Sequence, residues 1–349
     1  MTTASLQYPK PLRAGDTIAL TAPSSGVPPM WHPRLDLAIA HLEALGFRVV
    51  EGQCLRAQFK DASAPADERA AEWMHFMCNP AIAAVMPPWG GERACDLLPL
   101  LDFDALRTCT PKWHLGFSDL STLHLPLALI SGWASAHGAN LMQRVPAQRD
   151  ALTSATLTVL ATPHGASVRQ NASTRFETHG PDISQHPDAP FALTEPSCWK
   201  QLNGNVAPVR FSGRLIGGCI DTIAWLAGSR FGDVPSFVRR HRPEGTVLYL
   251  ENAEMPSPGL LRALLALRRM GWFDDLAGLL IGRSAGANPL APDRLSYTDA
   301  LTAVLGDLRC PVLIDVDIGH LPPQLTLING ALAEVHFAEG RGSITQHFV

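Results

Sequence analysis

The chain has 349 residues, of which 46% are hydrophobic and 17% are charged, with a formal net charge of −4 at pH 7. This composition is typical of a globular protein with two domains, and the net negative charge argues against a nucleic-acid partner. No run of 18 apolar residues predicts a membrane span, and residues 1–16 lack the apolar region of a signal peptide. The seven cysteines have no CxxC spacing, so we expect reduced thiols and a cytoplasmic location.

The first half of the chain alternates short apolar runs with amphipathic segments. Residues 17–22 predict a buried strand that ends at Pro23, and apolar residues at helical spacing predict a helix over 34–45, closed by Gly46. The other elements predicted in this half are strands at 47–50, 82–86 and 111–115, helices at 66–78 and 120–130, and a helical or turn segment at 97–106. Strands that alternate with helices predict a parallel α/β sheet.

Three loops follow predicted strands of this sheet. They are residues 23–26, 89–92 and 117–119. Because the ligand crevice of a parallel α/β sheet lies at the carboxyl ends of its strands, we expect these loops to border a binding site.

Ser118 lies where the 111–115 strand turns into the 120–130 helix. Gly116 permits a tight turn, and the first helical N–H groups favour a developing negative charge beside the hydroxyl. This arrangement is that of a nucleophile elbow. The alternative is that Ser118 only caps the helix, as serine often does at such turns.

Residues 163–205 differ in composition from the rest of the chain. They are rich in Pro, Ser, His, Asn and Gln and have little periodicity. We expect a long, mobile connection between two domains that passes over the site and orders partly with ligand. Trp199 in this segment either anchors the loop by packing or stacks on substrate.

The α/β alternation resumes after residue 214. Predicted strands lie at 246–250, 276–281 and 312–316, and predicted helices lie at 260–270 and 297–305; before them, residues 215–218 lead into an apolar segment at 220–226. Neither a GxGxxG nor a GxxxxGK[ST] motif is present, so we expect no nucleotide cofactor.

Glu251 and His320 follow the ends of two of these strands. Together with Ser118 they give the order serine, acid, histidine, which is also the order of α/β-hydrolase triads. His320 would take the proton of Ser118, and Glu251 would fix the imidazole tautomer. Taken singly, each is also typical of an ordinary surface residue.

Two other classes of protein are alternatives. Asp315, Asp317 and His320 have a DxDxxH spacing that could bind a metal in a metal-dependent hydrolase, although neighbouring strand residues need not converge with the histidine. A non-catalytic binding protein with the same fold is the other alternative, against which the intact Ser, Glu and His argue.

Ordered motifs along most of the chain resemble the LD-carboxypeptidase family of serine peptidases, which includes the microcin C immunity peptidases. The motifs are Arg13-Ala14-Gly15-Asp16, Ala22-Pro23-Ser24, Pro88-Trp89-Gly90-Gly91-Glu92, residues 97–103, Gly116-Phe117-Ser118-Asp119, residues 213–218, Leu248-Tyr249-Leu250-Glu251, Gly271-Trp272-Phe273 and Asp317-Ile318-Gly319-His320.

The resemblance implies a catalytic triad of Ser118, His320 and Glu251. It also implies an oxyanion hole from the backbone N–H groups of Asp119 and of Gly90 or Gly91. No metal or cofactor is implied. The family fold is an N-terminal Rossmann-like domain and a C-terminal β/α domain, with the site in the groove between them and often a homodimer.

We therefore predict an α/β protein with an N-terminal domain at 1–165, a linker at 166–205 and a C-terminal domain at 206–349. We expect a serine carboxypeptidase that cuts the L,D-bond of muropeptide tetrapeptides in cell-wall recycling. A peptidase that detoxifies a microcin C-type aminoacyl- or peptidyl-nucleotide is the alternative. Two differences from the family's motifs concern the substrate. Residues 88–92 stand where many members have Arg-Gly-Gly-Tyr-Gly, and they resemble the microcin branch of the family. Gly218-Cys219 stands where the family has a Gly-Asn pair.

Overall fold

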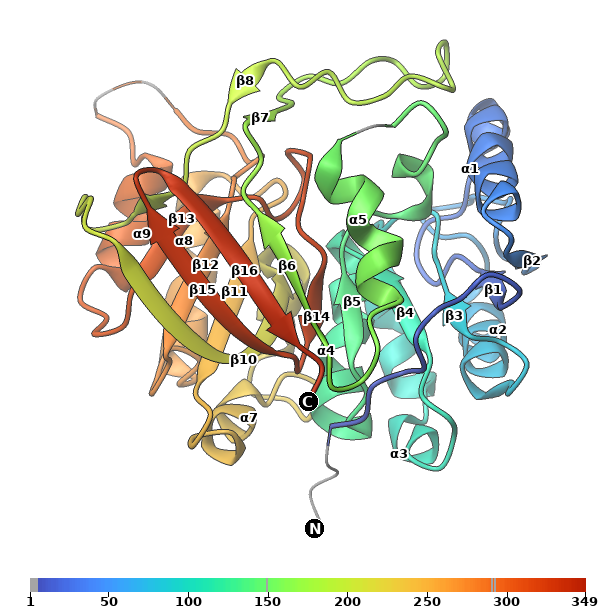
Figure 1. Cartoon of the computed structure of the whole chain (residues 1–349), viewed down its shortest axis with the longest axis horizontal. Helices are drawn as coiled ribbons and strands as arrows, with labels where there is room; N and C mark the ends of the chain where they lie inside the picture. Colours follow the sequence, from blue (N-terminus) through green and yellow to red (C-terminus); the bar gives the residue numbers. More distant parts are fainter. Residues whose placement is uncertain (1–5, 149, 290, 292) are drawn as a thin grey trace.

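The computed structural model describes residues 6–148, 150–289, 291 and 293–349. Two sheets lie side by side in it, with helices packed against them (Figure 1). The α/β prediction is confirmed, because both sheets have a core of parallel strands. No described helix combines the length and apolar character that a membrane crossing requires.

The first sheet has the strand order β14-β5-β4-β3-β1-β2. Its strands are β1 (Thr17–Leu20), β2 (Arg48–Glu51), β3 (Ala84–Val85), β4 (Trp113–Gly116), β5 (Ser135–His137) and β14 (Leu327–Asn329). The first five are parallel, whereas β14 returns from the C-terminal part of the chain and pairs antiparallel with β5. The two halves of the chain are therefore joined through this sheet.

The second sheet has the strand order β6-β16-β15-β10-β11-β12-β13-β9. Its parallel centre is β10 (Val209–Cys219), β11 (Thr246–Glu251), β12 (Gly278–Gly282) and β13 (Val312–Val316). Antiparallel strands flank it: β6 (Ser167–Asn171), β9 (Lys200–Gln201), β15 (Leu332–Ala338) and β16 (Arg341–His347).

The longer helices follow the predicted positions. They are α1 (His32–Ala44), α2 (Ala66–Cys78), α8 (Ser257–Arg269) and α9 (Tyr297–Leu305). A further long helix, α5 (Ala151–Leu160), was not predicted. The shorter α-helices are α3 (Phe103–Leu106), α4 (Ser121–Pro126), α6 (Ile220–Ile223) and α7 (Val234–Arg240). One buried apolar cluster runs from Trp73 on α2 through Leu123 on α4 to Leu250 and Leu264, so the two sheets share a core.

The segment expected to be an irregular linker contains four short strands. Two of them, β6 and β9, lie at opposite edges of the second sheet, and β7 (Arg175–Phe176) pairs with β8 (Glu195–Pro196). The partners of β6 and β9 are the distant strands β16 and β13, so local periodicity does not reveal these two strands. The chain between β7 and β8 passes above the body of the molecule (Figure 1). The domain limits at 165 and 205 stay predictions.

Trp199 is a core residue. Its side chain is fully buried, and its Nε1 donates a hydrogen bond to Asp317 at 2.7 Å. Of the two roles considered for this tryptophan, the structure favours packing.

Candidate active site

Ser118 lies at the sharp turn between β4 and a 3₁₀ helix (Ser118–Leu120) that leads into α4. Its φ is +66°, a conformation that costs a non-glycine residue about 1 to 3 kcal/mol and is typical of functional turns. Ser118 is not the helix cap, because Phe117 occupies that position without a side-chain hydrogen bond. The hydroxyl instead lies 2.9 Å from His320 Nε2.

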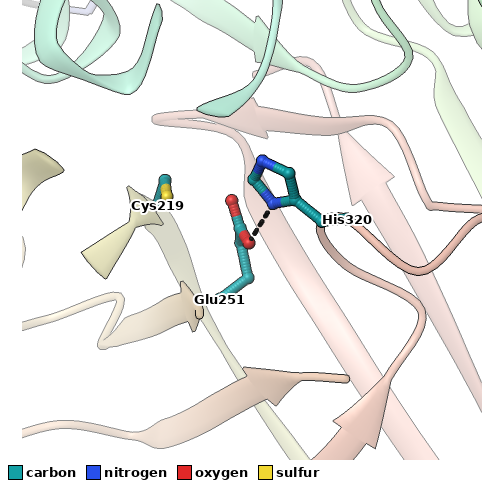
Figure 2. Close-up of side chains that lie close together, drawn as sticks. All are labelled: Cys219, Glu251 and His320. Carbon is teal, nitrogen blue, oxygen red and sulfur yellow. Dashed lines mark hydrogen bonds and ion pairs between the residues drawn. The ribbon is translucent and has the colours of Figure 1, made fainter. Parts of the chain in front are cut away.

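His320 connects the serine to a buried carboxylate. Its Nδ1 lies 2.9 Å from Glu251 Oε2 (Figure 2). An ionised carboxylate only accepts hydrogen bonds, so Nδ1 carries the proton and Nε2 accepts from the Ser118 hydroxyl. The structure thus brings together, in one hydrogen-bonded chain, three residues that are 69 and 202 positions apart in sequence.

Rigid backbone fixes this carboxylate. Glu251 is the last residue of β11, and its side chain is completely buried. Gly319, with a φ of +99°, leaves room for it, since a Cβ there would lie 2.8 Å from Glu251 Cβ. A side chain at position 319 would therefore push the acid away from the imidazole.

The surroundings of His320 favour its protonated form. Burial lowers the pKa of the imidazole, but the charge of Glu251 and the hydrogen bond to it outweigh burial. The net result is a pKa raised above the ordinary 6.5, to which the carboxylates of Asp221 and Glu254 also contribute.

A pH profile tests this balance. If His320 is a base that must be neutral in the free enzyme, kcat/KM falls as pH drops through the His320 pKa, and we expect the midpoint of this acid limb to lie above 6.5. Removing the Glu251 charge in Glu251→Gln should shift that midpoint to lower pH. An acid limb below 6.5 in the wild type would contradict the assignment.

Gly90 lies against the serine on the other side of the turn. A Cβ at position 90 would lie 2.7 Å from Ser118 Cβ and 2.8 Å from the Asp119 backbone nitrogen. Only glycine permits this approach, and it places Gly90 beside the N–H of Asp119. Gly90 and Asp119 are therefore neighbours of Ser118, whereas the atoms nearest to a Cβ at Gly91 belong to Ser24 and Ser25. The oxyanion-hole role of Gly90, Gly91 and Asp119 stays a prediction.

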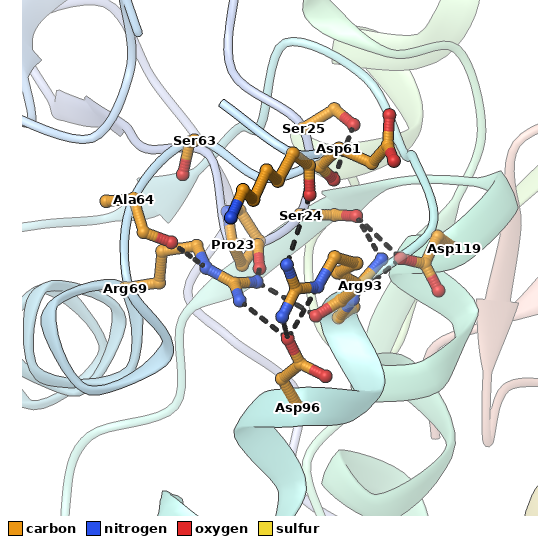
Figure 3. Close-up of polar contacts among 12 residues, drawn as sticks. Pro23, Ser24, Ser25, Asp61, Ser63, Ala64, Arg69, Arg93, Asp96 and Asp119 are labelled. Carbon is orange, nitrogen blue, oxygen red and sulfur yellow. Dashed lines mark hydrogen bonds and ion pairs between the residues drawn. The ribbon is translucent and has the colours of Figure 1, made fainter. Parts of the chain in front are cut away.

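The Asp119 side chain ties together the loops around that position. Its buried carboxylate accepts a hydrogen bond from Ser24 Oγ at 2.6 Å (Figure 3). It also accepts from the Ala94 backbone N–H at 2.7 Å and from Thr122 Oγ1 at 3.1 Å. Burial raises the pKa of this carboxyl, and these hydrogen bonds oppose the rise. The carboxylate thereby holds the loops after β1 and β3 against the serine turn.

Buried Arg69 braces the same loops from behind. Its guanidinium donates to the backbone oxygens of Pro23 and Arg93, at 2.7 and 2.8 Å, and forms an ion pair with Asp96 at 3.0 Å (Figure 3). The residues that position the glycine pair are thus fixed by several strong hydrogen bonds.

A cavity of about 530 Å³ opens at Ser118 and His320. Its walls include Gly90, Gly91 and aromatic side chains such as Trp89, and residues of the β7–β8 connection form another wall. This volume lies within the range of small-molecule binding sites.

The β7–β8 connection is held at few points. Buried Arg34 on α1 donates from Nη1 to the backbone oxygens of Pro187 and Ala189, at 3.1 and 2.9 Å, and Phe191 N–H donates to Gln148. Most of its other residues are exposed or half-buried.

Limited proteolysis tests the expected mobility of this segment. We expect cleavage between 177 and 195 before any cut in the two sheets, and slower cleavage with a bound ligand, because few apolar contacts hold this chain. Protection equal to that of the sheets in the ligand-free protein would contradict this expectation.

The structure does not bring the DxDxxH residues together. Asp315 forms an ion pair with Lys200 at 2.8 Å, and Asp317 forms one with Arg283 at 2.6 Å. Within the described part of the chain, neither aspartate belongs to a group of potential metal ligands with His320. The metal-hydrolase alternative therefore loses its ligand set, because these carboxylates face other partners.

Several residues of the site carry no signal of their own in the sequence. Phe117 packs edge-on against the His320 ring, with 4.8 Å between ring centroids, and its backbone N–H donates to Asn140. Ser24 donates a hydrogen bond to the Asp119 carboxylate, and Arg34 donates to backbone oxygens of the β7–β8 connection. The available hints were the positions of residues 23–26 and 117–119 at strand ends and the motifs that contain Ser24 and Phe117.

Comparison with known proteins shows the family of the chain. The LD-carboxypeptidase N-terminal domain matches residues 18–138, and the LD-carboxypeptidase C-terminal domain matches residues 212–335. The fold and these matches define a carboxypeptidase. The chain belongs to the LD-carboxypeptidase family.

Three curated relatives span nearly the whole chain. A putative carboxypeptidase of Vibrio cholerae is 26% identical, covering 95% of both chains. The microcin C7 self-immunity protein MccF of Escherichia coli is 25% identical, covering 97% of this chain and 96% of its own. A probable murein peptide carboxypeptidase of Bacillus subtilis is 26% identical, covering 96% and 93%.

Two solved structures share the fold. MccF in complex with glutamyl sulfamoyl guanosine has a TM-score of 0.83 at 22% identity, covering 98% of this chain and 99% of its own. The muramoyltetrapeptide carboxypeptidase of Oxalobacter formigenes has a TM-score of 0.71 at 22% identity, covering 95% and 98%.

Proposed function

We propose that this protein is a serine-type carboxypeptidase that hydrolyses an amide bond next to a terminal carboxylate, with the L,D-bond of a muropeptide tetrapeptide as substrate. The observation that carries the proposal is the hydrogen-bonded chain Ser118–His320–Glu251 at the wall of the cavity. The family membership and the murein peptide carboxypeptidase among the relatives support the substrate class.

The geometry supports a two-step reaction. His320 Nε2 takes the hydroxyl proton while Ser118 Oγ attacks the scissile carbonyl carbon. The carbonyl oxygen becomes an oxyanion, which the backbone N–H groups of Asp119 and of Gly90 or Gly91 stabilise. The imidazolium, stabilised by Glu251, then protonates the leaving amine, and an acyl-enzyme on Ser118 remains.

A water molecule completes the reaction, and the same protein groups transfer the protons. His320 removes a proton from water, which attacks the acyl carbonyl, and returns that proton to Ser118 Oγ as the acid product leaves. Each step uses groups of the chain and one water molecule. No metal takes part.

A second candidate is a peptidase that cleaves a microcin C-type aminoacyl- or peptidyl-nucleotide. Two observations favour it: residues 88–92 resemble the microcin branch, and the microcin C7 self-immunity protein is among the relatives that span nearly the whole chain. Both candidates use the same triad, so they differ only in what the cavity accepts.

Assaying both substrates side by side separates the two functions. The wild-type protein is incubated with a muropeptide tetrapeptide and with an aminoacyl sulfamoyl nucleoside, and the products are measured by mass spectrometry. We expect release of the terminal D-alanine with the higher kcat/KM. Cleavage of the nucleoside conjugate with no change of the tetrapeptide would assign the second function instead.

Chelation tests the absence of a catalytic metal. Because the reaction above needs only protein groups, prolonged dialysis against EDTA should not lower kcat. Loss of activity on dialysis and its recovery with Zn²⁺ would contradict the serine mechanism.

Location and assembly complete the proposal. We place the protein in the cytoplasm, which the seven free cysteines support, and we expect the homodimer that the family resemblance implies. Light scattering of the purified chain measures the assembly, and a monomer at all concentrations would contradict it.

A further inference from the structure

A thiol lies on the far side of the candidate catalytic acid. Cys219 ends β10 and Glu251 ends the neighbouring β11, and the parallel register makes these two residues direct partners. Figure 2 shows Cys219 and His320 on either side of the Glu251 carboxylate. One atom each of the thiol, the carboxylate and the imidazole lie within 4.8 Å of one another.

One oxygen of the Glu251 carboxylate has no hydrogen-bond partner among the described residues. Glu251 Oε2 bonds His320, whereas the buried Oε1 has no hydrogen-bond partner among the described residues. Cys219 is 1% exposed and Glu251 is completely buried. A buried carboxylate oxygen without a partner is costly, so this position favours a cation or a donor.

The chemistry of this trio is that of a zinc ligand set. Thiolate, imidazole and carboxylate are the three side-chain groups that bind Zn²⁺, which takes four ligands at about 2.0 to 2.3 Å. Tetrahedral ligands at those lengths lie about 3.5 Å apart, so the widest separation must close by on the order of 1 Å. The fourth position is left for water.

We propose that Cys219, Glu251 and His320 form an inhibitory binding site for a thiophilic divalent cation such as Zn²⁺. The inhibition, but not the binding, rests on the proposed triad. Of the three ligands, His320 lines the cavity and keeps 26% of its side chain exposed, so a cation would enter past His320 to reach the buried Cys219 and Glu251. The nearby carboxylates of Asp221 and Glu254 add negative potential that attracts a cation.

Coordination would stop the reaction at the histidine. Binding releases the Cys219 thiol proton to solvent, and the thiolate, the carboxylate and one imidazole nitrogen donate electron pairs to the metal. If Nδ1 is the ligand, the imidazole proton moves to Nε2, which then no longer accepts the Ser118 proton. If Nε2 is the ligand, the metal occupies the required electron pair directly. Removal of the metal and return of the thiol proton restore the enzyme.

Zinc titration of matched variants tests the proposal. The variants are Cys219→Ala and Cys219→Ser, and the control is Cys78→Ser/Cys109→Ser, which removes a thiol pair whose sulfurs lie 3.3 Å apart away from the triad. Each protein is titrated with Zn²⁺, and each rate is divided by that protein's own metal-free rate. Thermal unfolding shows which variants are folded.

We expect Zn²⁺ to reduce the wild-type and control rates at least tenfold and EDTA to restore them. Both Cys219 variants should need at least about tenfold more Zn²⁺ for the same inhibition, because one ligand is lost. Equal inhibition of the wild type and the Cys219 variants would overturn the proposal.

Cobalt binding separates this proposal from the proposed function. Co²⁺ bound to a thiolate gives an ultraviolet charge-transfer band, which we expect in the wild type and the control and not in Cys219→Ala. The band together with undiminished turnover would support the site and overturn the triad. Absence of the band from the control would overturn the site and leave the triad intact.

Discussion

Ser118→Ala should lower kcat by at least about a thousandfold, because losses of a triad nucleophile reach several orders of magnitude. The substitution removes one hydroxyl whose hydrogen bond is to His320. It keeps the Cβ, so the backbone strain at the φ of +66° stays the same and folding should be unaffected. Steady-state kinetics and thermal unfolding of the same preparation measure both effects.

Ser25→Ala is the matched control for this variant. Ser25 also lines the cavity, but its hydroxyl lies near the Asp61 backbone oxygen, not near the imidazole. We expect Ser25→Ala to keep kcat within about tenfold of the wild type. A Ser118→Ala protein that keeps more than about a tenth of the wild-type kcat would show that the serine mechanism is wrong.

Glu251→Gln should lower kcat by about 10³- to 10⁴-fold, whereas Glu254→Gln should cost much less. Glu251 is buried and holds His320 Nδ1 at 2.9 Å, and an amide there can present the wrong group and stabilise the wrong tautomer. Glu254 is exposed in the following loop, and its backbone N–H bonds Asp221 at 3.0 Å. It acts on His320 only through its charge.

Both glutamine variants are compared on one substrate, with kcat and KM determined separately. The two substitutions are chemically identical and lie three positions apart, so each is the control of the other. If Glu254→Gln is the more damaged enzyme, the two roles are reversed.

The sequence predicted the elements that local pattern determines. The helix at 66–78 and the helix at 297–305 have the predicted bounds. Their apolar spacing and the residues that flank them are local features, which can be found without knowledge of the rest of the fold. Ser118, Glu251 and His320 could be singled out for the same reason, since each follows a run that reads as a strand.

Contacts that depend on the order of the strands in a sheet could not be predicted from the sequence. The contact of Cys219 with Glu251 requires that β10 and β11 are neighbours in register, and β14 joins the first sheet from the far end of the chain. The hydrogen bonds of Asp119 to Ser24 and Ala94 likewise join loops that only the folded sheet brings together. No periodicity in the sequence encodes such long-range pairings.

The central claim is that Ser118 forms a covalent acyl-enzyme, and trapping that intermediate tests it most directly. A tetrapeptide analogue with D-lactate in place of the terminal D-alanine has a better leaving group, so acylation should outpace hydrolysis and the acyl-enzyme should accumulate. The reaction is quenched in acid within the first turnovers, and the protein is digested and analysed by mass spectrometry. We predict an added acyl mass on the peptide that contains Ser118, absent from Ser118→Ala. Turnover of the ester with no adduct, or with the adduct on another residue, would contradict the account.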